Sequence, residues 1–249
     1  MYKKILLGLL TTSAFVYAAD QHVIGGVFIG IQGGLSTPGT SKNMLEDALN
    51  SEATPPTVTS ASSSGNDNGY GGLSIGFDFP IDTSEHVSLG LETGFNYQNS
   101  LVEYTAETGG GSITSTFGKT FMIPILATFK TVLPVGLSFV LKAGASYVQQ
   151  EISYSGTTSL LTEQPTKTNK FTPTFAAGVG WQFQKFNISA LYTRTLGTSS
   201  ASDINNGTPL SMNLYALQLT YTFEVQDTQW WQDNSPNNII EKQSIDEGL

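Results

Sequence analysis

The segment that decides the fold is residues 212–223, which read MNLYALQLTYTF. One set of alternate positions is apolar or aromatic: Tyr215, Leu217, Leu219, Tyr221 and Phe223. The other set includes uncharged polar residues: Gln218, Thr220 and Thr222. Successive side chains of a β-strand point to opposite sides, so a period of two residues is typical of a strand with two different faces. The segment therefore predicts a strand with one apolar face and one polar face.

The same alternation occurs in seven further segments. They are Ile24–Ser36, Gly69–Pro80, Val87–Gln98, Lys119–Thr131, Val135–Gln150, Phe171–Gln184 and Asn187–Leu196. Each segment reaches the roughly 9–11 residues that a tilted strand needs to cross a bilayer.

The residue types on the two faces indicate which face meets lipid. A soluble β-sandwich carries Lys, Glu and Arg on its exposed face. Here the polar face is mostly Gly, Ser, Thr, Asn and Gln, and charged residues make up 12% of the chain, about half of the usual share. The apolar face is bulky and aromatic, as a lipid-facing wall must be. The pattern favours a crowded polar interior surrounded by lipid.

The connections between the segments alternate in length. Short ones are Ile81–His86, Val132–Pro134 and Lys185–Phe186, and long ones are Thr37–Asn68, Asn99–Gly118, Glu151–Lys170 and Gly197–Ser211. Outer-membrane barrels show this alternation of tight periplasmic turns and longer surface loops. The sequence therefore predicts an all-β fold: an eight-stranded, antiparallel up-and-down transmembrane β-barrel with short periplasmic turns and long extracellular loops.

Both ends of the chain differ from the barrel segments. Lys3 and Lys4 precede a short apolar run that ends in Ala18 and Ala19, which predicts a secretory signal peptide over residues 1–18. The barrel domain is then 19–223, and residues 224–249 form an acidic tail that we expect to be flexible and periplasmic. Loss of the two lysines would take the net charge from −9 to −11, which argues against nucleic acid as a partner. The absence of cysteine excludes disulfides and thiolate chemistry.

Two stretches carry a resemblance to a known family. Phe28-Ile29-Gly30 opens the first strand, and the stretch from Tyr215 to Phe223 closes the last on an aromatic residue. With these features the chain resembles, over about Val23–Phe223, the small outer-membrane β-barrels of the OmpA/OmpX type in Gram-negative bacteria, also called the porin family. In the simplest members the closing aromatic ends the chain, whereas here residues 224–249 follow.

The resemblance implies a location and several partners. The chain would lie in the bacterial outer membrane as a monomer, in contact with membrane lipid and lipopolysaccharide. The barrel-assembly machinery would recognise Tyr215, Leu217, Leu219, Tyr221 and Phe223 as an assembly signal. Receptors on host cells or phages would meet the surface loops.

Charged residues at inward positions are the candidates for a functional site. Glu92 and Lys142 lie at similar heights above their periplasmic turns, and an isolated charge in a narrow lumen needs a partner. We expect them to pair across the lumen, in either a structural or a gating role. Asp78 and Lys130 lie nearer the periplasmic mouth, where we expect them to be solvated. Arg194 shares the parity of outward residues and indicates either a rim position or a bulge.

The sequence offers little enzyme chemistry. Its two histidines, His22 and His86, both fall at the predicted periplasmic end, away from the outer-leaflet lipid that a lipid A-modifying barrel enzyme would attack. We predict no catalytic, cofactor or metal site.

Three functions follow in order of preference. The first is a non-enzymatic structural or surface-interaction protein, adhesin-like, that acts through its extracellular loops. The second is a narrow ion or small-solute channel, although an eight-stranded interior is only wide enough for its own side chains. The third is a lipid A-modifying enzyme.

Overall fold

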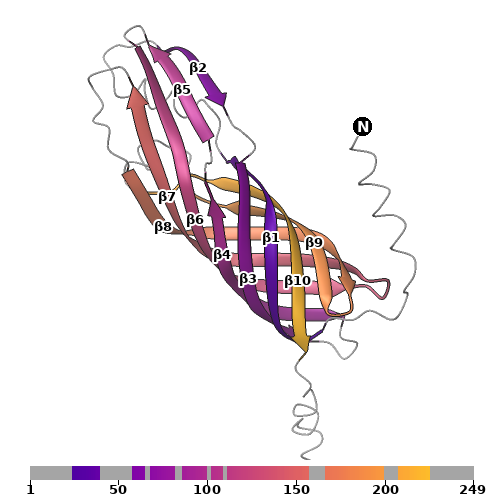
Figure 1. The fold of residues 1–249 in the computed structure, drawn as a ribbon. Helices are drawn as coiled ribbons and strands as arrows, with labels where there is room; N and C mark the ends of the chain where they lie inside the picture. The colour runs from indigo at the N-terminus through magenta and orange to yellow at the C-terminus, as the bar shows by residue number, and fades with distance from the viewer. Residues whose placement is uncertain are drawn as a thin grey trace, which may run out of the picture.

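The computed structural model describes residues 24–39, 58–64, 68–81, 86–99, 102–108, 111–156, 166–198 and 207–224. They form ten β-strands (Figure 1): β1 Gly26–Pro38, β2 Val58–Ser64, β3 Asn68–Pro80, β4 Val87–Gln98, β5 Val102–Thr108, β6 Gly111–Val132, β7 Leu137–Gly156, β8 Thr166–Phe183, β9 Phe186–Thr195 and β10 Met212–Glu224. Within these residues, no helix is long and apolar enough to cross a membrane.

Eight of the strands close into a ring. Its order is β6-β4-β3-β1-β10-β9-β8-β7, and β7 pairs again with β6. All neighbouring strands in the ring are antiparallel. The first barrel strand, β1, pairs with the last, β10, from Gly26↔Glu224 to Pro38↔Met212. The predicted eight-stranded up-and-down barrel is confirmed, and β4 has the predicted bounds.

The remaining strands, β2 and β5, extend the sheet beyond one end of the barrel (Figure 1). β5 pairs with Gly111–Phe117 of β6, and β2 pairs with β5. The upper ends of β7 and β8 continue on the other side of β6. We call this part of the sheet the extension. It comprises β2, β5, Gly111–Phe117 of β6, Glu151–Gly156 of β7 and Thr166–Lys170 of β8. The prediction that Thr37–Asn68, Asn99–Gly118 and Glu151–Lys170 are loops was therefore wrong in part, because each contains strand residues.

A β-bulge marks where β6 leaves the barrel. The register between β6 and β7 shifts between Phe117 and Thr120, so Gly118 and Lys119 oppose Glu151 alone. Below the shift β6 pairs with β4, up to Gln98↔Thr120, and above it β6 pairs with β5, from Val102↔Phe117. Bulges bend strands and are common at barrel rims. This one lets a single strand serve both parts of the sheet.

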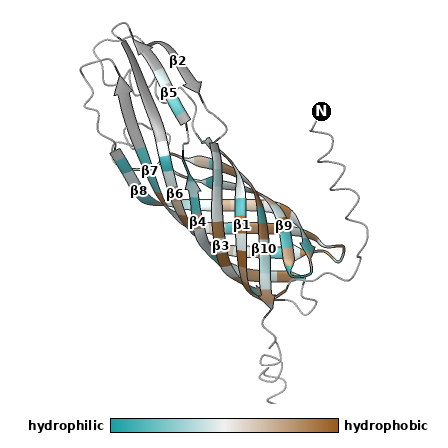
Figure 2. Ribbon diagram, in the orientation of Figure 1, coloured by the Kyte–Doolittle hydropathy of each residue, from teal (hydrophilic) through white to brown (hydrophobic). Residues whose placement is uncertain are grey.

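The outer wall of the barrel is apolar, as predicted. Large hydrophobic side chains such as Leu91 and Leu217, each 66% exposed, point away from the lumen. Figure 2 shows hydrophobic residues concentrated along the barrel part of β1, β3 and β10. Aromatic pairs lie near both ends of the wall, with Tyr192–Tyr215 towards the extension and Phe186–Tyr221 at the opposite end. Two aromatic girdles are typical of membrane barrels.

Above the upper girdle the outer face changes character. On β8, exposed Phe171 is followed towards the extension by the exposed Asn169 and Lys167. On β7, Tyr147 is likewise followed by Gln149 and Glu151 at the outward positions. Charged and amide groups are costly in hydrocarbon but not in water. The apolar wall thus ends just below the bulge, and the extension lies in the aqueous phase.

The inner face has two zones. Its upper part, next to the extension, holds a buried apolar cluster that includes Tyr70, Met122, Val148, Leu210, Met212 and Leu214. Its lower part is polar and charged. The predicted polar interior holds along the lumen, but in the upper part apolar side chains lie beside buried polar ones such as Asn96, Gln98 and Gln150. The predicted signal peptide, His22 and residues 225–249 of the predicted tail lie outside the described residues.

An epitope tag tests which end faces outward. A tag between Gly109 and Gly110, in the connection between β5 and β6, is expected to bind antibody on intact cells. The same tag between Pro134 and Val135, in the turn between β6 and β7, should bind only after the outer membrane is permeabilised. Flow cytometry measures both, and slower migration after boiling on a gel shows that each tagged barrel has folded. Labelling of the Pro134 tag on intact cells would invert the topology.

Candidate functional site

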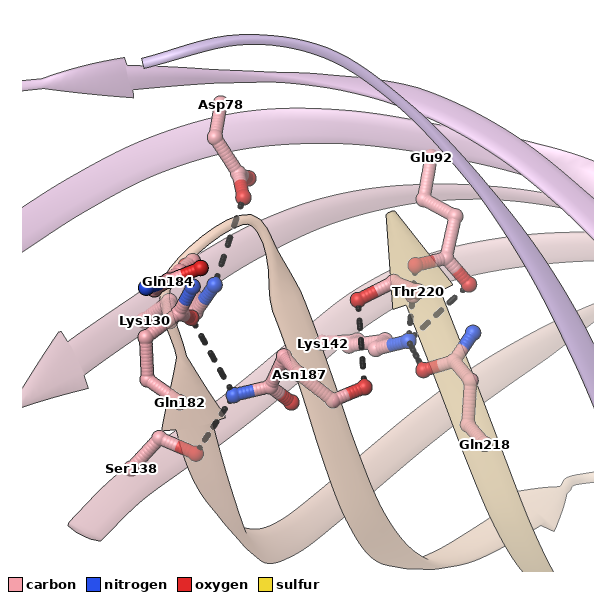
Figure 3. A network of polar contacts seen from close by, with 10 residues as sticks. All are labelled: Asp78, Glu92, Lys130, Ser138, Lys142, Gln182, Gln184, Asn187, Gln218 and Thr220. Carbon is pink, nitrogen blue, oxygen red and sulfur yellow. Dashed lines mark hydrogen bonds and ion pairs between the residues drawn. The ribbon is translucent and has the colours of Figure 1, made fainter. Parts of the chain in front are cut away.

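The charged zone of the lumen is built by the alternation of four barrel strands. Asp78 on β3, Glu92 on β4, Lys130 on β6 and Lys142 on β7 all occupy inward positions, because their neighbours in sequence belong to the apolar outer wall. All four residues are at least nine-tenths buried. Figure 3 shows them pointing into the same part of the barrel.

The structure brings Glu92 and Lys142 together across the lumen. Lys142 Nζ donates to Glu92 Oε1 at 2.9 Å and to Oε2 at 2.7 Å. It also donates to Gln218 Oε1 at 3.0 Å, and Gln218 Nε2 donates to Ser74 Oγ at 3.1 Å (Figure 3). An ammonium group has three N–H donors, so this set of acceptors satisfies it. The contact links β4, β7, β10 and β3, of which only β3 and β4 are neighbours in the ring.

Asp78 and Lys130 form a second, looser pair. Lys130 Nζ lies 3.8 Å from Asp78 Oδ2, which is too long for a direct hydrogen bond. The prediction that both residues are solvated was wrong, since they are 5% and 7% exposed. The cause lies at the β8–β9 turn, where Gln182 and Asn187 are almost fully buried and fill the lower mouth.

Amides and hydroxyls hold that lower mouth closed. Asn187 Nδ2 donates to Ser138 Oγ at 2.9 Å and to Gln182 Oε1 at 3.3 Å. Thr220 Oγ1 donates to the carbonyl oxygen of Asn187 at 3.5 Å (Figure 3). Side chains from β7, β8, β9 and β10 therefore cross the mouth beside the Asp78–Lys130 pair.

The charged zone is electrically balanced. Two carboxylates and two ammonium groups lie there, so the formal charges sum to zero. A buried charge without a partner is costly, and removal of one partner from a pair costs more than the pair itself contributes. The balance accounts for how four charged side chains persist inside a narrow lumen.

A glycine makes room for this zone. A Cβ at Gly90 would lie closest to the backbone carbonyl oxygen of Phe77, and 2.6 Å from both Asp78 Oδ1 and Thr128 Oγ1. Real Cβ atoms do not approach so closely, so the inward face of β4 needs a residue without a side chain at this position. By contrast, a Cβ at Gly71, on the outer face of β3, would lie no nearer than 3.9 Å to another atom.

The space left in the lumen is small. A cavity of about 30 Å³ lies among the charged residues, between Asp78, Glu92, Lys130, Lys142 and Gln218. It suits a few buried waters, because one water needs roughly 10–15 Å³ measured in this way. A second cavity, of about 10 Å³, lies higher up against Tyr70 and Met212. Neither is the size of a solute pathway.

The upper mouth is closed by the chain that enters β10. Leu210 is fully buried, and its N–H donates to Gln150 Oε1 at 2.8 Å. Gln150 Nε2 in turn donates to Met212 Sδ at 3.3 Å. Sequence reasoning missed this closure, since Leu210 precedes the regular alternation of β10. Gln218 was foreseeable, because its parity on β10 places it in the lumen.

The remaining predicted residues lie apart from the charged zone. The predicted assembly strand is β10, with Tyr215, Leu217, Leu219 and Phe223 exposed on the outer wall and Tyr221 half-buried there. Arg194 is an exposed rim residue rather than a bulge, because the pairings of β9 run without a register shift.

His86 lies just before β4, at the end of the barrel with short turns. The described residues contain no group of His, Cys, Asp and Glu suited to a metal ion.

A closed eight-stranded barrel with a lipid-type outer wall and a filled lumen defines a membrane barrel of the outer-membrane type. The chain belongs to the family described as outer membrane protein beta-barrel domain, which matches residues 19–200. It is thus an outer-membrane β-barrel of the Gram-negative type. The sequence matches no curated protein.

Solved structures of small outer-membrane proteins are similar to the chain at low identity. Ail, the attachment invasion locus protein of Yersinia pestis, is 12% identical with a TM-score of 0.44, over 82% of this chain and 100% of Ail. Neisserial surface protein A is 11% identical with a TM-score of 0.41, over 81% and 100%. OprG from Pseudomonas aeruginosa is 11% identical with a TM-score of 0.37, over 83% and 100%.

The Glu92–Lys142 pair is tested by a double-mutant comparison. Lys142→Met should lower the free energy of unfolding by about 3 kcal/mol, because it leaves the Glu92 carboxylate buried without its partner. The double variant Glu92→Gln with Lys142→Met should lose less than the single variant. Urea titrations of the barrel in lipid vesicles measure both. Leu141→Met, on the outer wall, is the control for the change of side chain. Additive losses would show that the two residues are not coupled.

A pair of glycine substitutions tests how tightly the charged zone is packed. Gly90→Ala should destabilise the barrel by about 1–3 kcal/mol through overpacking against the Phe77 carbonyl and the side chains of Asp78 and Thr128. Gly71→Ala, in open space on the outer face, should be neutral or stabilising by up to about 1 kcal/mol, since alanine loses less backbone entropy in a strand. The same urea titration compares them. Equal effects at the two positions would mean that the zone is not packed as described.

Proposed function

We propose that this protein is non-enzymatic and acts at the cell surface in an adhesin-like role, through the extension. The observation that carries the proposal is the continuation of β6, β7 and β8 beyond the apolar wall, where β5 and β2 widen the sheet. A barrel that served only to fill the membrane would need no sheet in the water beyond it. The polar outward residues Lys167, Asn169 and Glu151 fit such an exposed position.

The state of the lumen supports a scaffold rather than a transporter. The charged zone is internally paired, the upper mouth holds Leu210, and the cavities are of about 30 and 10 Å³. A solute would have to break the Lys142–Glu92 contact and displace the apolar cluster above it. The barrel therefore fits the part of a rigid base for the extension.

A narrow channel is the second candidate, and one observation favours it. The cavity of about 30 Å³ adjoins all four charged side chains, so a rearrangement of one pair would join water to the polar zone. On this view Glu92 and Lys142 are a gate. Planar-bilayer recordings distinguish the two: we expect no stepwise conductance from the wild-type protein, and conductance that appears in Lys142→Met would favour the gate.

The proposed partners follow from the two surfaces. Membrane lipid and lipopolysaccharide would surround the outer wall, the barrel-assembly machinery would engage β10 during folding, and receptors on host cells or phages would meet the extension. A catalytic role receives no support from His86, the one histidine among the described residues, because it lies at the end opposite the extension.

Removal of the extension tests the proposed role. Replacement of residues 100–117 by a short Gly-Ser linker deletes β5 and upper β6 but keeps the barrel pair Gln98↔Thr120. Cells that display this variant should lose adhesion to epithelial monolayers, relative to cells with the wild-type protein. Gel mobility before and after boiling confirms that the variant barrel is folded. Unchanged adhesion by a folded variant would refute the role of the extension.

A further inference from the structure

The extension has two edges of different character. One edge is the upper part of β8, above its first pairing with β9 at Thr174↔Thr195. It contains the exposed Lys167 and Lys170. Lysine on an edge strand opposes the pairing of another chain with it. This edge therefore carries the features of a protected edge.

The other edge is β2, the terminal strand of the sheet. Its seven residues read VTSASSS and include neither a charged residue nor proline. The one irregularity in its pairing with β5 lies between Val58 and Ser60, and from Ser60 to Ser64 the register is regular. An edge strand of this kind presents backbone N–H and C=O groups that a further strand can pair with.

We propose that β2 is a homotypic docking edge, which pairs antiparallel with β2 of a second copy of this chain. The inference rests on the proposed surface-interaction role and names the partner. A second copy fits because β2 is uncharged, so two identical strands meet without like charges opposite one another. Antiparallel pairing of identical strands also closes under a two-fold axis, which limits the assembly to a dimer.

The geometry places the two copies in opposed membranes. β2 runs towards the rim of its own barrel, because Ser64 is in register with Glu103 near the bulge and Val58 with Thr108 at the far end. An antiparallel partner runs the other way, so its barrel lies beyond the far end of the extension. When Ser60–Ser64 of the two copies pair, Ser64 of one copy lies opposite Ser60 of the other. The two Ser64 residues, each at the end of β2 nearest its own barrel, are then four residues apart, about 13 Å at roughly 3.3 Å per residue. The contact would therefore join two cells or two vesicles.

The central residue of the regular part identifies the position for a test. If the segments Ser60–Ser64 pair symmetrically, Ser62 lies opposite Ser62 of the second copy. Like charges at such a position oppose pairing, and opposite charges favour it. Lysine and glutamate at position 62 should therefore behave differently alone and in a mixture. Thr105, which is in register with Ser62 but lies on β5, one strand away from the edge, is the matched control position.

Vesicle aggregation measures the pairing directly. The full chain is refolded into phosphatidylcholine vesicles, and turbidity is followed at about 0.15 M NaCl, where long-range repulsion is screened. Wild-type vesicles should aggregate, while Ser62→Lys vesicles and Ser62→Glu vesicles should each aggregate about tenfold less. A mixture of the two variant populations should recover the wild-type rate. Thr105→Lys vesicles should resemble the wild type.

A cross-link gives a second readout. The chain has no cysteine, so Ser62→Cys introduces a single thiol, and oxidation of aggregated vesicles should yield a disulfide-linked dimer on a non-reducing gel. Dispersed wild-type vesicles, a mixture that fails to recover, or an equal loss with Thr105→Lys would each overturn the homotypic proposal. If the vesicles stay dispersed while cells still adhere through the extension, the surface role stands and only the identity of the partner is wrong.

Discussion

The structure depends on the requirement that every backbone N–H and C=O group inside the membrane has a partner in the protein. Hydrocarbon offers no hydrogen bonds, so a sheet in lipid must close on itself. Here the closing step is the pairing of the first barrel strand, β1, with the last, β10, along its whole length. Closure then fixes the two faces of each strand. Because successive residues alternate between lipid and lumen, each inward charge is delivered into a narrow interior shared with the other strands.

The inward charges and the closure of the lumen stabilise each other. Lys142 reaches Glu92 and Gln218 across the ring, so the contact ties together strands that have no backbone hydrogen bonds with one another. The side chains that separate this contact from bulk water, Gln182 and Asn187 below and Leu210 above, also remove any wide path through the barrel. A polar lumen is thus compatible with a barrel that serves as a scaffold.

The barrel could be predicted from the sequence because lipid imposes a strong and simple pattern. Residues such as Leu89, Leu91 and Phe95 on β4 reveal the strand and its outward face without any structure. The same rule placed Glu92 and Lys142 inside. It failed for Asp78 and Lys130, because their burial depends on Gln182 and Asn187, which come from distant strands. It also failed for β2 and β5, since strands in water need no bulky apolar face and their Ser-, Thr- and Glu-containing sequences resemble those of loops.

The bulge at Gly118 and Lys119 is the point at which one constraint replaces another. Below it, closure removes every strand edge, so the barrel needs no protection from other chains. Above it the sheet is open, and two edges appear in water. Lys167 and Lys170 protect one of them, whereas the sequence VTSASSS leaves the other without such residues. If open edges were only a by-product of a long hairpin, both would need protection to the same degree. Their difference is the physical reason to assign recognition to β2. The recognition itself would use backbone N–H and C=O groups rather than any particular side chain.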